Sequence, residues 1–346
     1  QELLPRSPSN FDYFRKDPGF GSGLFVLSGI CSGLLLQLME NDQSCSCGCT
    51  PSRSAFKAAA SHDIEQRVIP AQTFLMGENL GIGNAFDGEM QVHAVTVSEF
   101  EIDATSVTNA DFQKFITATG YKTEAEVFGS SAVFHLLVDA PDEDVDPPLR
   151  NLPWWQNVRN ADWRHPGGAN SNIDALMDHP VVHVSWNDAV AYCEWADRRL
   201  PTEAEWECAS RGGLVSETFP WGSELMTADG KWQANIFQGD FPNVNTTEDG
   251  FLSTAPVRTY APNAYGLWQT VGNVWEWCSD FFDANYYRYG EPFNPQGPSE
   301  GQSRVMRGGS FLCHDSYCNR YRNAARTKNT PDSSMSNTGF RTVMKG

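Results

Sequence analysis

The sequence predicts an α+β fold built as a single irregular domain that is poor in regular secondary structure. Glycine and proline are abundant, with 29 and 20 residues, and they occur together with 11 Trp, 10 Tyr and 21 Phe. This combination is typical of a chain with many turns held in place by aromatic side chains. Helical periodicity is limited to three short segments before residue 213, and neither a repeat nor a second core pattern follows. We therefore expect one domain over residues 64–346.

Extended segments open this domain. Residues 67–77 begin the ordered region, and residues 92–103 alternate apolar and polar side chains as a strand does. Thr108 is placed to cap a helix with one apolar face, which ends at Gly120.

Two further helices are expected close together. Ser185 can cap a helix that Pro201 ends. Thr202 and Glu205 form a capping box that opens the next helix, which runs to Gly212. Beyond this point the chain is largely Gly, Pro, Asn and aromatic residues, which predicts loops.

The composition also limits the class of partner. The formal net charge is −18, whereas a protein that binds nucleic acid needs a basic face. Hydrophobic residues make up 40% and charged residues 20% of the chain, which is typical of a globular protein. We therefore expect no nucleic acid partner.

Residues 1–44 resemble a signal peptide. Arg15 and Lys16 precede an apolar run over residues 24–39, which is shorter than a membrane span and is interrupted by Gly and Ser. The small and polar residues 45–63 predict a flexible tail. Entry into the secretory pathway is expected, and a sequon for N-glycosylation at residues 245–247 is compatible with it.

Cys313 and Cys318 are candidates for a chemical site. Five residues turn a helix through about 500°, and an odd offset places side chains on opposite faces of a strand. The two sulfurs can therefore converge only in a bend or an irregular loop. A disulfide, a zinc site that is incomplete with two Cys and the adjacent His314, and a pair of thiolates for soft Cu(I) all remain open, because spacing does not choose among them.

Several longer motifs occur in a fixed order. After an opening IPAQTFLMG, the chain reads SWNDAVAYCEWADRRLPTEAEWE, GNVWEW, RVMRGGSF and NTGFR. Over about residues 67–343 it thus resembles the formylglycine-generating enzyme family, also called sulfatase-modifying factors. The segment CHDSYCNRYRNAARTKNTPDSSMSNTGFR is similar to the catalytic branch. The resemblance implies a fold related to C-type lectins.

The resemblance also implies a reaction. Members of the catalytic branch oxidise the cysteine of a Cys-x-Pro-x-Arg segment in newly made, unfolded sulfatase polypeptides to formylglycine, with O₂ and a thiol reductant. Cys313 and Cys318 would hold Cu(I), and Cys318 would also form a transient mixed disulfide with the substrate. A reversible disulfide between the two cysteines in the metal-free protein is compatible with this role.

Further site residues follow from the same resemblance. Ser310 and Trp275 match catalytic positions beside the copper and the O₂ pocket, and His314, Arg326 and Asn337 match positions of the substrate cleft. Two structural Ca²⁺ sites are implied as well. The first comprises Asn235, the Ile236 carbonyl, Asp249 and the Phe251 carbonyl. The second comprises Gln269, Gly272, Val274 and Glu276, where Gln269 replaces an asparagine.

The chain departs from the family in its other cysteines. Secreted members commonly carry two core disulfides, but the position expected to pair with Cys193 is Thr342, and the other pair is Ser210 and Asn323. Cys208 and Cys278 are additional. The fold is therefore expected to depend on packing and calcium more than on disulfides.

The CSCGC stretch of the tail resembles the extension that retains secreted members in the endoplasmic reticulum. Cys45, Cys47 and Cys49 would then contact thiol-oxidoreductase partners in the lumen. Residues 49–53 read CTPSR and themselves fit the substrate pattern. One hypothesis is that this tail acts as a pseudosubstrate or is oxidised at Cys49, and the other is that the match arises by chance.

Three other functions are alternatives to the oxidase. An inactive paralogue that binds sulfatase chains would lack the cysteine pair. An iron-dependent sulfoxide synthase would need a helical domain rich in His and Glu, whereas the chain has only seven His. A glycan-binding module would follow from the fold alone. The cysteine pair favours the oxidase.

Overall fold

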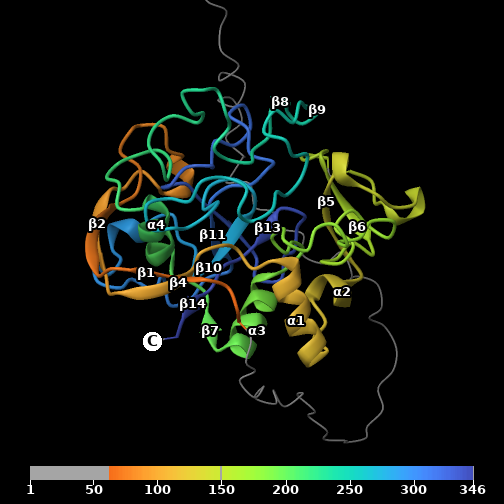
Figure 1. Ribbon diagram of the computed structural model, residues 1–346, viewed down its shortest axis with the longest axis horizontal. Helices are drawn as coiled ribbons and strands as arrows, with labels where there is room; N and C mark the ends of the chain where they lie inside the picture. The colour runs from red at the N-terminus through yellow and green to blue at the C-terminus, as the bar shows by residue number, and fades with distance from the viewer. Residues whose placement is uncertain (1–61, 149, 346) are drawn as a thin grey trace, which may run out of the picture.

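The computed structural model describes residues 62–148 and 150–345. Two four-stranded sheets organise it (Figure 1). The first sheet has the order β1 (Gln66–Ile69), β4 (Phe100–Asp103), β14 (Val343–Met344), β7 (Arg198–Arg199). All its pairs are antiparallel, and Val343 lies between Ile102 and Arg199. This sheet joins the two ends of the described chain.

The second sheet carries the segment that matters for function. Its order is β12 (Arg326–Asn329), β11 (Arg304–Arg307), β10 (Trp275–Phe281), β13 (Thr338–Gly339). Figure 1 shows β10 and β11 near the middle of the molecule. The pair of β10 and β13 is parallel, with Trp275 opposite Thr338. Residues 308–325 connect β11 to β12 and contain both candidate cysteines.

Three hairpins lie around these sheets. They are β2 (Gln72–Met76) with β3 (His93–Val97), β5 (Ser130–Phe134) with β6 (Trp155–Arg159), and β8 (Gly239–Asp240) with β9 (Val244–Asn245). Short 3-10 turns are η2 (Ala85–Asp87), η3 (His135–Leu137), η4 (Asp142–Asp144) and η5 (Tyr286–Arg288).

Four helices are present in the described residues: α1 (Asn109–Thr119), α2 (Glu124–Phe128), α3 (Trp186–Ala196) and α4 (Glu203–Arg211). The predicted caps Thr108, Ser185 and Thr202 each accept a hydrogen bond from a backbone N–H of the first turn. Among the described residues no α-helix follows α4. The prediction of an irregular α+β domain is confirmed.

Two elements differ from the prediction in their bounds. The helix that Ser185 caps ends at Ala196, before Pro201, because Asp197 adopts a left-handed conformation and β7 follows. The expected strand 92–103 divides in two, and the ordered region that begins at 67–77 contains two short strands, β1 and β2. None of the described helices has both the length and the apolar character needed to cross a membrane.

The main core packs α1 and α3 against the second sheet. Phe112, Trp163, Tyr192 and Trp277 are almost fully buried there, and the same cluster includes both candidate cysteines. Contacts of the domain already begin at His62, whose Nε2 lies 2.7 Å from Asp103. The predicted signal segment 1–44, most of the tail, and Cys45, Cys47 and Cys49 lie outside the described residues.

Candidate active site

The chain leaves β11 through a tight turn. Gly308 and Gly309 both have positive φ angles, 96° and 74°. A Cβ atom at Gly308 would lie 2.7 Å from the Thr270 carbonyl oxygen, and one at Gly309 would lie 2.9 Å from the Arg320 carbonyl oxygen. Only glycine fits both positions without a shift of the backbone, and the turn places Ser310 in a fully buried position.

Two further turns bring the cysteines together. The Cys313 N–H donates to the Ser310 carbonyl at 2.9 Å, and the N–H groups of Tyr317 and Cys318 donate to the His314 carbonyl at 3.1 and 2.7 Å. The Sγ atoms of Cys313 and Cys318 are 3.0 Å apart, and both thiols are free and buried. The prediction that the sulfurs converge through an irregular bend is confirmed.

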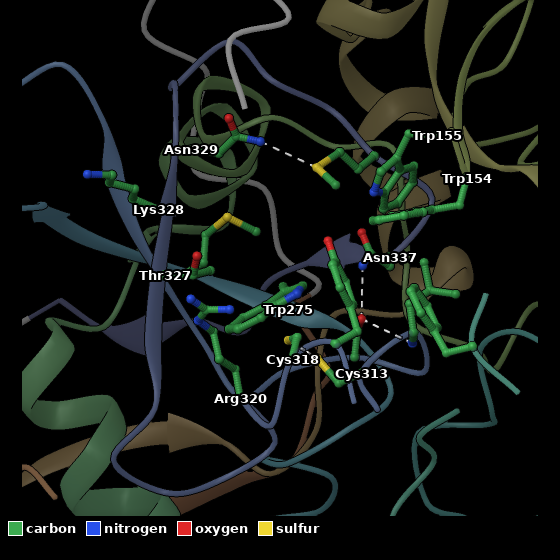
Figure 2. A pocket seen from close by; sticks show the side chains of 16 residues that line it. Trp154, Trp155, Trp275, Cys313, Cys318, Arg320, Thr327, Lys328, Asn329 and Asn337 are labelled. Atoms are coloured by element: carbon green, nitrogen blue, oxygen red, sulfur yellow. Dashed lines mark hydrogen bonds between the residues drawn. The ribbon is translucent and has the colours of Figure 1, made fainter. Parts of the chain in front are cut away.

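A cavity opens beside the two thiols (Figure 2), and Ser310, Trp275 and Asn337 line it with them. The Asn337 Nδ2 donates to Ser310 Oγ at 2.9 Å. The Trp275 N–H donates to the Asn337 carbonyl at 2.9 Å, beside the parallel pairing of β10 and β13. Three segments far apart in the sequence thus meet at the cysteine pair.

The two thiols differ in acidity. The hydrogen bond from Cys313 lowers the pKa of Cys318 to about 6 against the effect of burial, and the positive charge of Arg320 acts in the same direction. Burial raises the pKa of Cys313 instead. Arg320 is held by Asp87, with its Nε 2.6 Å from the carboxylate. At neutral pH the metal-free pair therefore carries its negative charge on Cys318.

Aromatic side chains form another part of the cavity wall. Tyr317 stacks on Phe241 with ring centroids 4.5 Å apart, and Trp154 meets both rings edge-on at 5.1 and 5.5 Å. Figure 2 shows Trp154 and Trp155 across the cavity from Arg320. This wall presents an apolar surface beside the thiols.

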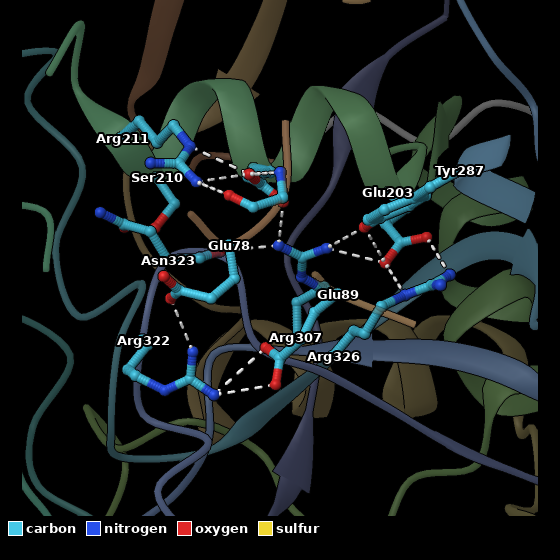
Figure 3. Close-up of polar contacts among 12 residues, drawn as sticks. Glu78, Glu89, Glu203, Ser210, Arg211, Tyr287, Arg307, Arg322, Asn323 and Arg326 are labelled. Atoms are coloured by element: carbon cyan, nitrogen blue, oxygen red, sulfur yellow. Dashed lines mark hydrogen bonds and ion pairs between the residues drawn. The ribbon is translucent and has the colours of Figure 1, made fainter. Parts of the chain in front are cut away.

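The structure does not bring His314 or Arg326 to the cavity lining. The His314 Nδ1 lies 2.7 Å from Ser316 Oγ, and its ring meets Phe237 edge-on at 6.1 Å. The Arg326 guanidinium is fully buried and contacts the Glu203 carboxylate at 2.6 and 2.7 Å. Figure 3 shows Arg326 in a buried network of ion pairs, and its Nη1 also donates to the Asp87 and Asp283 carbonyls.

The cysteine pair fits copper better than zinc. Two buried sulfurs are soft donors, which suit Cu(I). Within residues 62–148 and 150–345, no group of three or more His, Cys, Asp or Glu side chains could hold a metal ion. The described residues therefore do not supply the four N or S ligands that a structural zinc site needs.

Part of the first predicted calcium set lies together. Asp249 accepts from the N–H groups of Ile236 and Phe251 at 3.1 and 3.0 Å. The Asn235 Oδ1 is buried without a hydrogen-bond partner, and such an oxygen suits a hard cation. The Gln238 amide contacts both the Ile236 carbonyl and the Asp249 carboxylate, so a cation would displace it.

In the second predicted calcium set, the Glu276 carboxylate is already bound by other side chains. Glu276 accepts from Nε and Nη2 of Arg341 at 2.6 and 2.8 Å, from Ser106 Oγ at 2.8 Å and from Trp206 Nε1 at 2.7 Å. Only the Gln269 Oε1 is buried without a partner. These residues do not fit a calcium ion, because the ion pair with Arg341 already neutralises the only carboxylate.

The remaining described cysteines are free and buried, namely Cys193, Cys208 and Cys278. At the position of one family disulfide, Ser210 Oγ donates to Asn323 Oδ1 at 2.9 Å. A hydrogen bond thus connects two segments that, by the family resemblance, a disulfide is expected to join in secreted members.

Sequence reasoning missed part of the cavity lining, namely Trp154, Phe241, Tyr317, Arg320 and Lys328. Arg320 could have been noticed, because it follows Cys318 by two residues in a basic stretch of an acidic chain. Trp154 and Phe241 carry no local signal, since they reach the site only through the fold.

Comparisons with known proteins agree with this geometry. The model of the sulfatase-modifying factor enzyme 1-like domain matches residues 52–345. The formylglycine-generating enzyme of Streptomyces coelicolor is 60% identical over 273 residues, covering 79% of this chain and 87% of that relative. The formylglycine-generating enzyme of Mus musculus is 54% identical over 275 residues, covering 79% and 73%. The structure of PvdO from Pseudomonas aeruginosa, 21% identical, matches with a TM-score of 0.59 over 81% of this chain and 94% of that one, which supports the fold alone.

Proposed function

This chain belongs to the sulfatase-modifying factor family, and we propose that it is a formylglycine-generating enzyme that activates sulfatases. In this proposal it oxidises the cysteine of a Cys-x-Pro-x-Arg segment in an unfolded sulfatase, using O₂ and Cu(I) held by Cys313 and Cys318. The observation that carries the proposal is the pair of free thiols, 3.0 Å apart, at the cavity.

The reaction balances with a thiol reductant. The substrate Cβ loses one of its two hydrogen atoms and its bond to sulfur, which leaves as H₂S. It gains one oxygen atom of O₂ and becomes an aldehyde. The second oxygen atom becomes water, with two electrons and two protons from two reductant thiols that form a disulfide. When bound, Cu(I) would supply the one-electron chemistry that lets O₂ react with the substrate cysteine.

The protein's own residues would prepare the site for this chemistry. Arg320 favours the thiolate form of Cys318 and so readies it as a soft ligand. Asn337 fixes the Ser310 hydroxyl at the cavity, because its Nδ2 donates to the Ser310 Oγ. The aromatic wall of Trp154, Phe241 and Tyr317 would hold the substrate segment and exclude water.

Calcium at the first set would be structural. The partnerless Asn235 Oδ1 and the Asp249 carboxylate support a cation that joins loops lacking regular structure. Residence in the lumen of the endoplasmic reticulum stays a prediction, because residues 1–44 and the tail cysteines that suggest it lie outside the described residues.

Mass spectrometry of a peptide substrate tests the proposal. The full chain, loaded with Cu(I), is incubated in air with a thiol reductant and a peptide that contains Cys-Thr-Pro-Ser-Arg. We expect a thiol-to-aldehyde mass change that requires O₂. Cys313→Ser and Cys318→Ser should abolish it, whereas Cys278→Ser, at a buried free cysteine that does not line the cavity, should retain it.

The outcome that contradicts the proposal is equally specific. A peptide that binds to the wild-type protein but keeps its cysteine in every reaction would identify a non-catalytic relative. Loss of activity in Cys278→Ser to the same extent as in Cys313→Ser would show that the effect comes from general damage to the fold.

A further inference from the structure

The loop between β2 and β3, residues 78–92, exposes an unusual concentration of large apolar side chains. They are Leu80, Ile82, Phe86, Met90 and Val92, and their exposed fractions are 50%, 43%, 78%, 41% and 38%. Single exposed apolar residues are ordinary, but several in one short loop indicate an interaction surface. We call this segment the 78–92 loop.

Acidic side chains attach the 78–92 loop to the catalytic segment. Figure 3 shows Glu78 and Glu89 on either side of Arg322, each 3.0 Å from its guanidinium. These three side chains are at least 95% buried. Asp87 pairs with Arg320 at 2.6 Å. The loop is therefore held by its carboxylates, and its apolar side chains are not needed for that attachment.

The attachment points place the loop beside the cavity. Arg320 lines the cavity and follows Cys318 by only two residues. The side chain of Asn319, between them, donates from Nδ2 to the Ile82 carbonyl at 3.2 Å. A polypeptide that leaves the cavity on the Arg320 side meets the 78–92 loop.

We propose that the 78–92 loop is a docking surface for apolar residues that flank the target cysteine in an unfolded substrate. This inference rests on the proposed function. An unfolded chain exposes apolar side chains that its folded form buries, and the loop offers the matching surface next to the thiols. Contacts remote from the reacting atom would thus select unfolded chains over folded ones.

Steady-state kinetics with three peptides tests the docking surface. One is a seven-residue peptide centred on Cys-Thr-Pro-Ser-Arg, and two are longer peptides with Leu and Phe or with Ser on both flanks. The test variant combines Leu80→Ser, Ile82→Ser and Phe86→Ser. For the apolar-flanked peptide we expect KM to rise about tenfold at unchanged kcat, given the apolar area involved. The short and Ser-flanked peptides should be unaffected.

A matched control comes from another exposed aromatic residue. Phe128 ends α2 and is 60% exposed, and Figure 1 shows α2 and β2 on opposite sides of the molecule. Phe128→Ser should leave every KM unchanged. Fluorescence anisotropy with an apolar-flanked peptide, Ser in place of its Cys, measures binding to the metal-free protein without turnover, and the triple variant should bind it about tenfold more weakly.

Several results would overturn the inference. Equal KM values for apolar-flanked and Ser-flanked peptides on the wild-type protein would show that the flanks are not bound. A self-association that the triple variant abolishes would assign the surface to a second copy of the chain. A cross-link from residues 24–39 to the loop in the full chain would assign it to that segment. Failure of the proposed function is separate, because it would appear as no turnover of the short peptide by the wild-type protein.

Discussion

Asp280 keeps a proton that most aspartates lose well below neutral pH. It lies on β10 and is almost fully buried. Its carboxylate accepts from the Glu203 N–H at 2.8 Å and from Ser279 Oγ at 3.1 Å. Burial, with the charge of Glu203 added, raises the pKa of Asp280 to about 7.

This shift predicts a stability that falls as the pH rises. In the unfolded chain the Asp280 carboxyl loses its proton at about pH 4, whereas in the folded protein it keeps the proton up to about pH 7. The stabilisation is therefore complete below about pH 4 and is lost as the pH rises to about 7. Asp280→Asn removes the titration and retains an acceptor for the Glu203 N–H.

Urea unfolding at pH 5 and pH 8 measures this difference. The unfolding free energy of Asp280→Asn minus that of the wild-type protein should increase by about 2 to 3 kcal/mol between the two pH values. A difference that stays constant would show that Asp280 is ionised in the folded protein at both pH values.

Arg320 offers a second test at the residue scale. The Cys313 hydrogen bond and the Arg320 charge together lower the pKa of Cys318 to about 6. In reduced, metal-free protein, the thiolate absorbance should therefore appear near pH 6 and be missing in Cys318→Ser. Arg320→Gln should move it to higher pH by about one unit. An unchanged midpoint in Arg320→Gln would mean that the guanidinium does not act on the thiolate.

At the scale of elements, α4 connects to the second sheet through buried ion pairs. Glu207 contacts Arg211 at 2.7 Å and Arg307 at 2.5 Å, and it also accepts from the Gly77 N–H at 2.9 Å. Burial opposes ionisation of Glu207, but the two arginines hold its pKa below the ordinary value. The helix is thus fixed by charges that have no access to water.

Removing one partner should be costly. Glu207→Gln removes the negative charge that faces the buried guanidinium groups of Arg211 and Arg307. We expect a loss of about 3 to 5 kcal/mol in the unfolding free energy. Asp144→Asn removes a partner of the half-exposed Arg159 and should cost less than about 1 kcal/mol. Urea unfolding of both variants makes the comparison, and equal losses would contradict the role given to the buried network.

Local signals predicted the helices well and their ends less well. Thr108, Ser185 and Thr202 cap helices as expected because a cap needs only neighbouring residues. The box of Thr123 and Glu126, which opens α2, has the same signal and was missed. The early end of α3 could not be predicted, because the strand that follows it pairs with β14 at the other end of the chain.

The candidate site shows the same limit. Cys313 and Cys318 could be predicted to meet because their separation is local and the motif is specific. Asp87 and Arg320 lie 233 residues apart in the sequence. Such a contact arises only when the sheets have formed, so no pattern near either residue indicates it.

At the scale of the whole molecule, non-covalent contacts join distant segments of the described chain, residues 62–148 and 150–345, in which every cysteine is free. Ser210 lies on α4, and Asn323 lies in the connection between β11 and β12. Their hydrogen bond spans 113 residues of chain. The Ser210 Oγ also lies 3.0 Å from the Thr270 Oγ1, whose hydroxyl can donate to it, and the Asn323 carbonyl accepts from Arg307 at 2.6 Å. A buried polar network therefore closes a long loop across the protein.

A disulfide should be able to replace the hydrogen bond at this position. We expect Ser210→Cys combined with Asn323→Cys to oxidise in air, because the two side chains already touch inside the fold. Closing a loop of this length stabilises by up to about 4.7 kcal/mol through the unfolded state. Loss of the two polar side chains offsets part of this gain, so the oxidised double variant should unfold at a higher temperature than its reduced form.

Thermal unfolding with and without dithiothreitol measures the effect, and thiol titration counts the free cysteines. Each single variant serves as a control, since neither can form the new bond and both should be less stable than the wild-type protein. A double variant that stays reduced in air, or whose unfolding temperature is unchanged by dithiothreitol, would show that the two Cβ atoms are not in disulfide geometry. Formation of the bond would show that packing and hydrogen bonds hold this chain in the arrangement that its secreted relatives are expected to fix covalently.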